Sequence, residues 1–335
     1  MCSSDLARKA MEPEFRALQS EALLANPLLA FGKILLIRRE APASEGLNGG
    51  RMGLPQNWQG NCALPRQGVV NEIATLSPLR PDGTLTTVYR PAKPVVLADI
   101  DLHPDGERML FCMPGGSNNS WQVFEMRADG ASLRQVTQGL PPDIDNYDPC
   151  YLPHGDILFA STACIAGVPC VGGGSRVANM FRCAADGSAV RQLTFDQEHN
   201  WCPTVMEDGR ILYSRWEYTD TPHYFTRVLF AMNPDGTAQR AVYGSNSWWP
   251  NSTFHARPIP GQPNRVVAVI SGHHGVARMG ELLIFDLNRG QYEAEGVMQR
   301  IPGRGRPVEP IIVDGLVNAS WPKFVHPFPL AEEGT

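Results

Sequence analysis

Charged residues are scarce in this sequence, at 19% of 335 residues, and lysine and arginine form no cluster along the chain. The formal net charge is −5 and the pI about 5.9. Proteins that bind nucleic acid or anionic membrane surfaces use a basic patch that attracts phosphate groups. The composition therefore argues against nucleic acid as a partner and leaves an unidentified ligand or protein.

Long hydrophobic runs are missing as well. The longest apolar stretch, ALLANPLLAFGKILLI at residues 22–37, is interrupted by Asn26, Pro27, Gly32 and Lys33. A membrane-spanning helix needs about 18 or more consecutive apolar residues. The sequence therefore contains no predicted membrane span.

Several catalytic and cofactor motifs are absent. The eight cysteines form no C-x-x-C, no paired zinc spacing and no C-x-x-C-H, which is the attachment motif of c-type haem. There is no G-x-S-x-G of a serine hydrolase, no P-loop and no placed G-x-G-x-x-G. We therefore expect no haem c and no nucleotide cofactor, while the identity of any metal stays open.

The two ends of the chain need separate treatment. MCSSDL, residues 1–6, is what the end of a sequencing adapter would encode if GTG served as the start codon, so we interpret it as non-native and exclude it from fold reasoning. Residues 7–30 contain EPEFRALQSEALLAN, whose apolar positions have helical spacing and which Pro27 should end. We predict a helical connector over 7–30 and one domain over 31–335.

Glycine and proline are abundant instead. The 32 glycines and 29 prolines make up about 18% of the chain, against roughly 12% in average proteins. Many glycines belong to a repeat, in which three stretches each show a first D-G or H-G turn, two apolar runs and a second D-G turn. Equivalent turns lie 49 to 57 residues apart, with Gly106, Gly155 and Gly209 in the first set and Gly130, Gly187 and Gly236 in the second.

The repeat predicts the fold. A divergent fourth unit follows at FHARPIPGQPNRVVAVISG, a fifth is expected upstream at FGKILLIRRE, and a sixth begins at WPKFVHPFPLAEEGT. Asp-Gly turns suit hairpins, and runs such as ILF and VLF are continuously apolar, as in strands covered on both faces. A period near 50 residues with four strands per unit is typical of a β-propeller. We predict an all-β propeller with about five to six visible blades, in preference to a β-sandwich.

Five segments carry a family resemblance: NPLLAFGKILLIRR, NYDPCYLPHGDILFAST, GVPCVGGGSRVANMFRCAADGSAVRQLTF, NWCPTVMEDGRILYSRWEYTD and SGHHGVARMGELLIFD. They resemble the hydrazine synthase alpha subunit middle-domain family over roughly residues 20–330. The resemblance implies a propeller of TolB-like, WD40-like (PD40) repeats in a large, often extracytoplasmic bacterial protein. It also implies a chain truncated at both ends, and hence an incomplete ring.

The characterised enzyme of that family joins nitric oxide and ammonia with the help of c-type haems. Because no C-x-x-C-H occurs in this chain, the resemblance extends to the propeller and not to the haem chemistry.

GHHG, residues 272–275, is the first candidate site. His273 and His274 carry imidazoles that can ligate a metal, and the flanking glycines permit a sharp turn. Adjacent side chains in a strand point to opposite faces, so the two do not bind one ion unless the backbone turns. A simple connection between two strands of one blade is the favoured interpretation, and metal binding by His273 or His274 is the alternative.

Polar residues just before the inner strands form the second candidate site. In a propeller these positions line the central channel, and concave sites of this kind bind small ligands. The candidates are Asp101, Asp148, His199, His255 and His326, with Asp99 and Asp145 beside them. Each one alone is explained as well by turn formation, whereas the set predicts a polar channel.

The cysteines give two further hypotheses. Cys164 and Cys170 bracket the short loop IAGVP and are predicted to form a disulfide in an oxidising compartment. Cys202 with His199 is a candidate catalytic pair, whose activation depends on geometry that the sequence does not give. The alternative for Cys202 is a buried, unreactive thiol.

Two functions remain open on these patterns. The favoured one is a non-catalytic binding or scaffolding module of a larger bacterial protein, periplasmic or extracellular, with a ligand or protein partner at the channel or face. The other is a metal- or redox-dependent enzyme core that uses channel-facing His and Asp residues. Convergence of several of these side chains on one metal position would favour the enzyme.

Overall fold

The Asp-Gly and His-Gly turns lie where the sequence places them. In the computed structural model Gly106, Gly155 and Gly209 have φ angles of 72°, 87° and 83°, and each joins the first strand of a sheet to the second. The structure describes residues 3–29, 31–40, 52–115, 118–138, 140–218, 226–247, 249–272, 275–302, 317 and 319–331.

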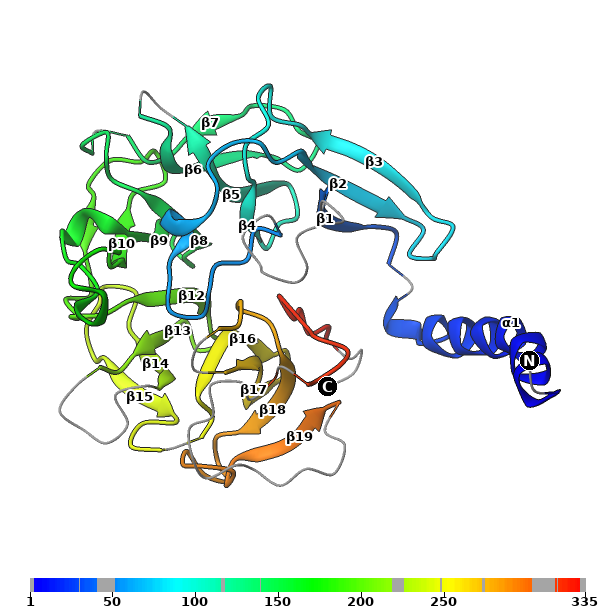
Figure 1. Ribbon diagram of the computed structural model, residues 1–335. Coiled ribbons are helices and arrows are strands. Elements are labelled where there is room, and N and C mark those ends of the chain that lie inside the picture. Colours follow the sequence, from blue (N-terminus) through cyan, green and yellow to red (C-terminus); the bar gives the residue numbers. More distant parts are fainter. Residues whose placement is uncertain are drawn as a thin grey trace.

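The described strands form five blades around a common axis (Figure 1). Blade 1 contains β1 (Ile34–Arg39), β2 (Asn71–Ser77) and β3 (Thr84–Tyr89). Blade 2 contains β4 (Ala98–Leu102), β5 (Arg108–Gly115), β6 (Ser120–Arg127) and β7 (Arg134–Gln135), and blade 3 contains β8 (Asn146–Tyr151), β9 (Ile157–Ser161), β10 (Asn179–Cys183) and β11 (Arg191–Gln192). Blade 4 contains β12 (Asn200–Val205), β13 (Ile211–Trp216), β14 (Arg227–Met232) and β15 (Arg240–Tyr243), and blade 5 contains β16 (Ser252–Ile259), β17 (Gln262–Ser271), β18 (Glu281–Asp286) and β19 (Val297–Ile301).

This architecture confirms the predicted β-propeller. Neighbouring strands within each blade are antiparallel, and a single parallel bridge between Arg227 and Ser252 connects blades 4 and 5. The β-sandwich alternative is wrong, since the sheets fan out around an axis instead of lying face to face (Figure 1). Within the described residues, blade 1 has three strands and each of the other blades has four.

The core lies between the blades. Phe111 of β5, Phe159 of β9 and Tyr213 of β13 occupy equivalent second strands and are fully buried. One cluster combines Leu110 of blade 2 with Phe159 and Phe181 of blade 3. Burying a side chain of this size stabilises the fold by about 1.5–3 kcal/mol, so stacking between blades explains why the apolar runs are continuous.

The second-turn glycines have a packing role that the first-turn glycines lack. A Cβ on Gly130 or Gly187 would overlap the carbonyl oxygen of Val88 or Val136, which belongs to the preceding blade. A Cβ on Gly155, by contrast, would meet open space. The repeat therefore keeps glycine at the second turn because the neighbouring backbone comes too close for a side chain.

Helices are confined to short segments and the N-terminus. α1 (Ser3–Leu24) ends before Pro27, as predicted, and η1 (Pro27–Leu29) follows it. α1 projects away from the blades, and Phe15 and Leu18 on its surface are exposed (Figure 1). None of the helices within the described ranges combines the length and apolar character needed to cross a membrane.

The segment 319–331 lies on the axial side of blade 5 (Figure 1). Phe324 and Gly280 form a bridge through two hydrogen bonds of 2.7 and 3.1 Å. An equivalent contact occurs between blades 3 and 4, where the Asn200 amide donates to the Ala178 carbonyl at 2.9 Å. The segment therefore takes the place of the inner strand of a sixth repeat unit.

Candidate functional site

The inner strands of blades 2 to 5 each have one left-handed residue that is not glycine, and so does the segment 319–331. These residues are Asp99, Asp148, Cys202 and His255, with φ between 49° and 54°, and His326 in the last segment, with φ of 44°. The first four lie in bulges that shift the register of β4, β8, β12 and β16. A bulge redirects the side chain of such a residue. We call these five residues the axial ring.

Hydrogen bonds link the ring members in sequence order. The Asp148 amide donates to Asp99 Oδ2 at 3.3 Å, and the Cys202 amide donates to Asp148 Oδ2 at 3.0 Å. The His255 amide bonds in turn to the Cys202 side chain. The imidazoles of His255 and His326 pack edge to face with centroids 4.2 Å apart. The ring thus satisfies the bulge amides and ties neighbouring blades together at the axis.

Asp99 and Asp148 form an acid pair. Their side chains share a hydrogen bond, and Asp99 Oδ2 also accepts from Cys112 Sγ at 3.0 Å. Burial, followed by the charge of Asp99, raises the pKa of Asp148 to about 7. Two carboxylates in one buried site repel each other strongly when both are ionised, so the pair holds one proton near neutral pH.

Arg278 is the buried cation that faces this acid pair. Its side chain is 1% exposed, and Nη1 lies 3.9 Å from both Asp148 Oδ2 and Cys202 Sγ. The guanidinium carbon lies 4.9 Å from the Trp201 ring centroid and 5.3 Å from that of Phe254. The carboxyl groups and the two aromatic faces together compensate for the loss of water around this charge.

A second polar layer lies two residues further along the inner strands. Asp101 Oδ2 accepts the Tyr151 amide at 2.9 Å, and Asp101 Oδ1 lies 3.7 Å from Arg257 Nη1. Arg257 also donates to Thr204 Oγ1 at 3.4 Å and lies 5.6 Å over the Phe328 ring. Asp101 comes from β4 and Arg257 from β16, so this ion pair reaches from blade 2 to blade 5.

Residues 52–68, which we call the axial cap, cross the face where the inner strands begin (Figure 1). On the blade 5 side, the Asn57 amide donates to the Val276 carbonyl at 3.0 Å and the Arg278 amide donates to the Pro55 carbonyl at 3.1 Å. These backbone hydrogen bonds hold the cap against blade 5.

The axial cap also contacts the ring beneath it. Asn61, in η2 (Asn61–Ala63), donates through Nδ2 to Asp99 Oδ2, and Arg278 Nη2 donates to the Gln59 carbonyl. Gly60 lies so close to Tyr147 that a Cβ would overlap the tyrosine hydroxyl. The cap therefore rests directly on Asp99, Arg278 and Tyr147 near the propeller axis.

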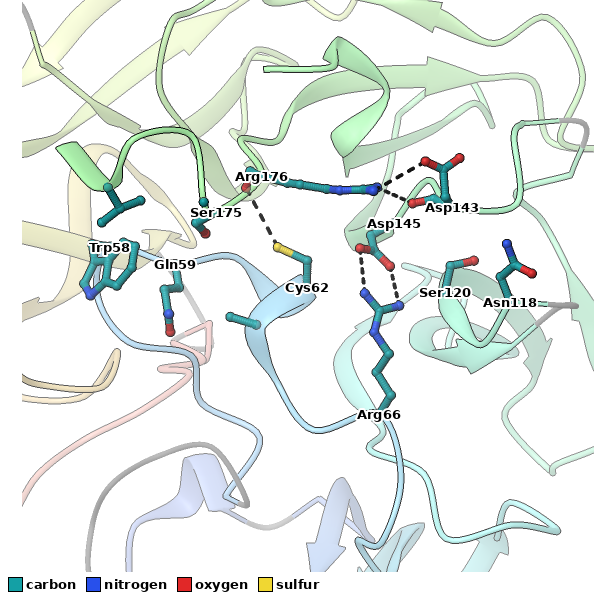
Figure 2. Close-up of a pocket in the computed structure, with 13 residues that line it drawn as sticks. Trp58, Gln59, Cys62, Arg66, Asn118, Ser120, Asp143, Asp145, Ser175 and Arg176 are labelled. Atoms are coloured by element: carbon teal, nitrogen blue, oxygen red, sulfur yellow. Dashed lines mark hydrogen bonds and ion pairs between the residues drawn. The ribbon is translucent and has the colours of Figure 1, made fainter. Parts of the chain in front are cut away.

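A pocket of about 730 Å³ opens beside the axial cap (Figure 2). We call it the face pocket. The cap contributes one wall, and the ends of blades 2 and 3 contribute the others; the lining residues are Trp58, Gln59, Cys62, Ala63, Arg66, Asn118, Ser120, Asp143, Asp145, Val171, Gly174, Ser175 and Arg176. This size suits a small ligand.

Two arginine–aspartate pairs set the electrostatics of the face pocket. Arg66 binds Asp145 through two hydrogen bonds of 2.7 and 2.9 Å, and Arg176 Nη2 lies 3.4 Å from Asp143 Oδ2 (Figure 2). Burial raises the pKa of the Cys62 thiol, which lies 3.8 Å from the Arg176 carbonyl. The pocket therefore presents many polar atoms and little net charge.

His199 lies away from the axial ring. Its ring stacks on Trp201 with centroids 4.8 Å apart, and its Nδ1 accepts the Ala178 amide at 3.1 Å. Burial lowers its pKa, so the imidazole is neutral. Its described contacts do not include Cys202, whose own pKa burial raises, so the geometry gives no activated Cys–His pair.

The remaining predicted residues separate into three groups. Asp148, His255 and His326 meet in the axial ring, Asp101 lies in the layer below it, and Asp145 binds Arg66 in the face pocket. His273 and His274 lie outside the described residues. Among the residues that the structure describes, no three His, Cys, Asp or Glu side chains are grouped closely enough to hold a metal ion.

The predicted disulfide stays a prediction. Cys164, in η3 (Thr162–Cys164), is a free thiol whose Sγ lies 3.3 Å from the Val177 carbonyl. Cys170 belongs to η4 (Pro169–Val171), and its side chain lies outside the described part of the chain.

Sequence reasoning did not single out Arg66, Arg278 or the pocket wall made by the axial cap. A signal for the ring was present, because Asp148, Cys202 and His326 each precede a proline at aligned positions of the repeat. No comparable pattern marks the cap, whose contacts join residues more than 200 positions apart.

Taken together, the blades and the axial ring define a β-propeller. No protein-family model matches the sequence, and no curated protein matches it. The hydrazine synthase structure from Kuenenia stuttgartiensis is similar with a TM-score of 0.59 and 15% identity over 80% of this chain. The present chain spans 39% of that chain, and at this identity the likeness concerns the fold alone.

Two TolB structures are similar at lower scores. A putative TolB from Agrobacterium tumefaciens has a TM-score of 0.49 and 14% identity over 71% of this chain and 78% of that chain. TolB from Acinetobacter baumannii has a TM-score of 0.47 and 12% identity over 75% of this chain and 59% of that chain.

Proposed function

We propose that this chain is a non-catalytic binding and scaffolding propeller module, and that the face pocket holds its ligand. The observation that carries this proposal is the pocket itself, a concave site of about 730 Å³ whose walls come from the axial cap and from two blades. Sites assembled from several rigid elements place their polar groups accurately, which suits selective binding.

The chemistry of the face pocket favours an uncharged, polar ligand. Each arginine is already paired with an aspartate, so an anion or a cation would meet a balancing charge of its own sign. Gln59, Asn118 and Ser175 add amide and hydroxyl groups, and Trp58 adds an aromatic surface. A neutral oligosaccharide satisfies these groups, because it offers many hydroxyl donors and acceptors together with apolar C–H faces.

The ionisation of the described thiols supports binding over nucleophilic catalysis. Burial raises the pKa of both Cys62 and Cys202. A thiol in that state is protonated and is a weak nucleophile.

The wider context of the module is also a proposal. We place it in a larger extracytoplasmic bacterial protein that resembles the hydrazine synthase alpha middle domain but lacks its haem c motif. The sequence segments quoted above support this assignment, as does the structural likeness to part of a longer hydrazine synthase chain. A periplasmic or extracellular location stays a prediction.

The second candidate is a metal- or redox-dependent enzyme core at the axis. It is favoured by one observation, the edge-to-face contact of His255 and His326, which brings two predicted imidazoles together. Metal analysis of the purified chain tests it, since a stoichiometric ion lost on mutation of both histidines would support this candidate.

Calorimetric titration with a panel of neutral trisaccharides tests the binding proposal. We expect at least one sugar to bind, and Arg176→Ala to weaken it about ten-fold, or about 1.4 kcal/mol. The matched control is Arg127→Ala, because Arg127 pairs with Asp129 at 3.2 Å outside the pocket, with side-chain exposures of 56% and 58% that match those of the Arg176–Asp143 pair. Absence of binding by every sugar, or equal effects of the two substitutions, would contradict the proposal.

A further inference from the structure

The face pocket and the acid pair share one segment. Gln59 and Cys62 of the axial cap line the pocket, while Asn61 between them donates to Asp99 Oδ2. Any change in the acid pair that moves Asn61 therefore also moves the pocket wall.

Two hydrogen bonds hold the cap above the pair. One runs from Asn61 Nδ2 to Asp99, and the other runs from Arg278 Nη2 to the Gln59 carbonyl. The same guanidinium has Nη1 3.9 Å from Asp148 Oδ2, which is too far for a hydrogen bond. Arg278 therefore has a carbonyl of the cap as its present partner and a carboxyl group as a competing one.

Loss of the shared proton changes both bonds. An ionised Asp148 repels Asp99, which is the acceptor for Asn61. It also attracts Arg278, and a charged acceptor binds a guanidinium more strongly than the Gln59 carbonyl does. Both effects weaken the two hydrogen bonds that hold the axial cap, from Asn61 to Asp99 and from Arg278 to the Gln59 carbonyl.

The other ionisable groups near the pair do not change their protonation state around neutral pH. Burial raises the pKa of Cys112, Cys202 and Tyr147, which therefore stay protonated. Burial lowers the pKa of His255 and also that of His326, which stay neutral. Burial lowers the pKa of Arg39 only to about 10, so it stays charged, and Arg278 remains the facing cation.

We infer that the Asp99–Asp148 pair is a proton-binding site that controls the axial cap, closed while the pair shares one proton and released when that proton is lost. One consequence of the inference rests on the proposed function: release of the cap should weaken ligand binding in the face pocket.

The direction of the pH dependence follows from the raised pKa of Asp148. Because this pKa is about 7, above the ordinary value of an aspartate, the closed state binds the proton more tightly than a state in which the pair is exposed. Closure is fully favoured below the ordinary pKa of an aspartate, and its advantage falls as the pH rises from there to about 7, above which it stays constant.

Hydrogen exchange of the cap peptides, corrected for the intrinsic pH dependence of exchange, tests the inference without any ligand. Between about pH 5.5 and pH 8.5 we expect protection of residues 55–63 to fall at least ten-fold, since one pKa unit of coupling corresponds to a factor of about ten. Asp148→Asn, which resembles the protonated acid, should keep the cap protected at both values.

Two further variants keep this test decisive. Asn61→Ala removes the cap-side bond and should leave the cap poorly protected at both pH values while the peptides of β9 and β13 stay protected. Asp101→Asn is the control, because it changes a buried axial aspartate that does not touch the cap, and it should retain the wild-type dependence. Protection that is constant with pH in the wild type, or unchanged pH dependence in Asp148→Asn, would overturn the inference.

Ligand titrations then separate this inference from the proposed function. If a trisaccharide binds in the face pocket, its Kd should rise about ten-fold over the same pH range, and not in Asp148→Asn. Cap release without any sugar binding would sustain the proton site and contradict the proposed function alone.

Discussion

The axial ring and the face pocket both contact the axial cap, and they use charged residues in opposite ways. Asp148 of the ring and Arg278, which faces it, are almost fully buried, and the Cys202 amide donates to the Asp148 carboxyl group. In the pocket, the side chain of Arg176 is 49% exposed and its partner Asp143 is 60% exposed. The difference indicates that the ring builds the propeller while the pocket remains available to a ligand.

The largest expected contrast between the two regions is in stability. Arg278→Ala leaves the acid pair without its facing cation and empties a space between Trp201 and Phe254, so it should lower the free energy of unfolding by about 3–5 kcal/mol. Arg176→Ala removes a solvated ion pair and should cost no more than about 1 kcal/mol. Urea denaturation followed by circular dichroism measures both values. If both variants lost a similar amount of unfolding free energy, the buried and the exposed arginine would not differ in structural importance as we propose.

A smaller loss of stability is expected from a substitution in the cap at its contact with Tyr147. Gly60→Ala should destabilise the protein by about 1–3 kcal/mol, because the new methyl group overlaps the Tyr147 hydroxyl. Tyr147→Phe removes that oxygen, so the double variant should regain part of the loss. Strictly additive effects in this double-mutant cycle would show that the cap does not rest on Tyr147.

The blades could be predicted from the sequence because their determinants are local. Asp-Gly turns require positive φ, and continuous apolar runs require cover on both faces, so Gly155 and the strand that follows it identify one unit by themselves. Repetition of this pattern about every 50 residues then predicts a circular arrangement of blades. The three-stranded blade 1 has the weakest version of the repeat, and its first strand is only half-buried.

The candidate site could be predicted only in part. Asp148, His255 and His326 are predicted at the channel because each should lie just before an inner strand, and the structure places them in the axial ring, at bulges within β8 and β16 and in the last segment. His199 was placed with them but lies in an aromatic stack, because it shares strand alternation with Trp201 and not with the bulge residue Cys202. The axial cap could not be located, because its position depends on contacts with Val276 and Arg278 far along the chain.

Thiol labelling of the native protein tests the separation of the two regions most directly. Cys62 lines the face pocket, whereas Cys112 and Cys202 lie buried beneath the cap. With methyl methanethiosulfonate and peptide mass spectrometry, we expect Cys62 to be modified in the folded state, slowly because burial raises its pKa, and the other two thiols only after unfolding. Modification of Cys202 as fast as Cys62 would contradict the account, because the axial ring would then be open to the same solvent as the pocket.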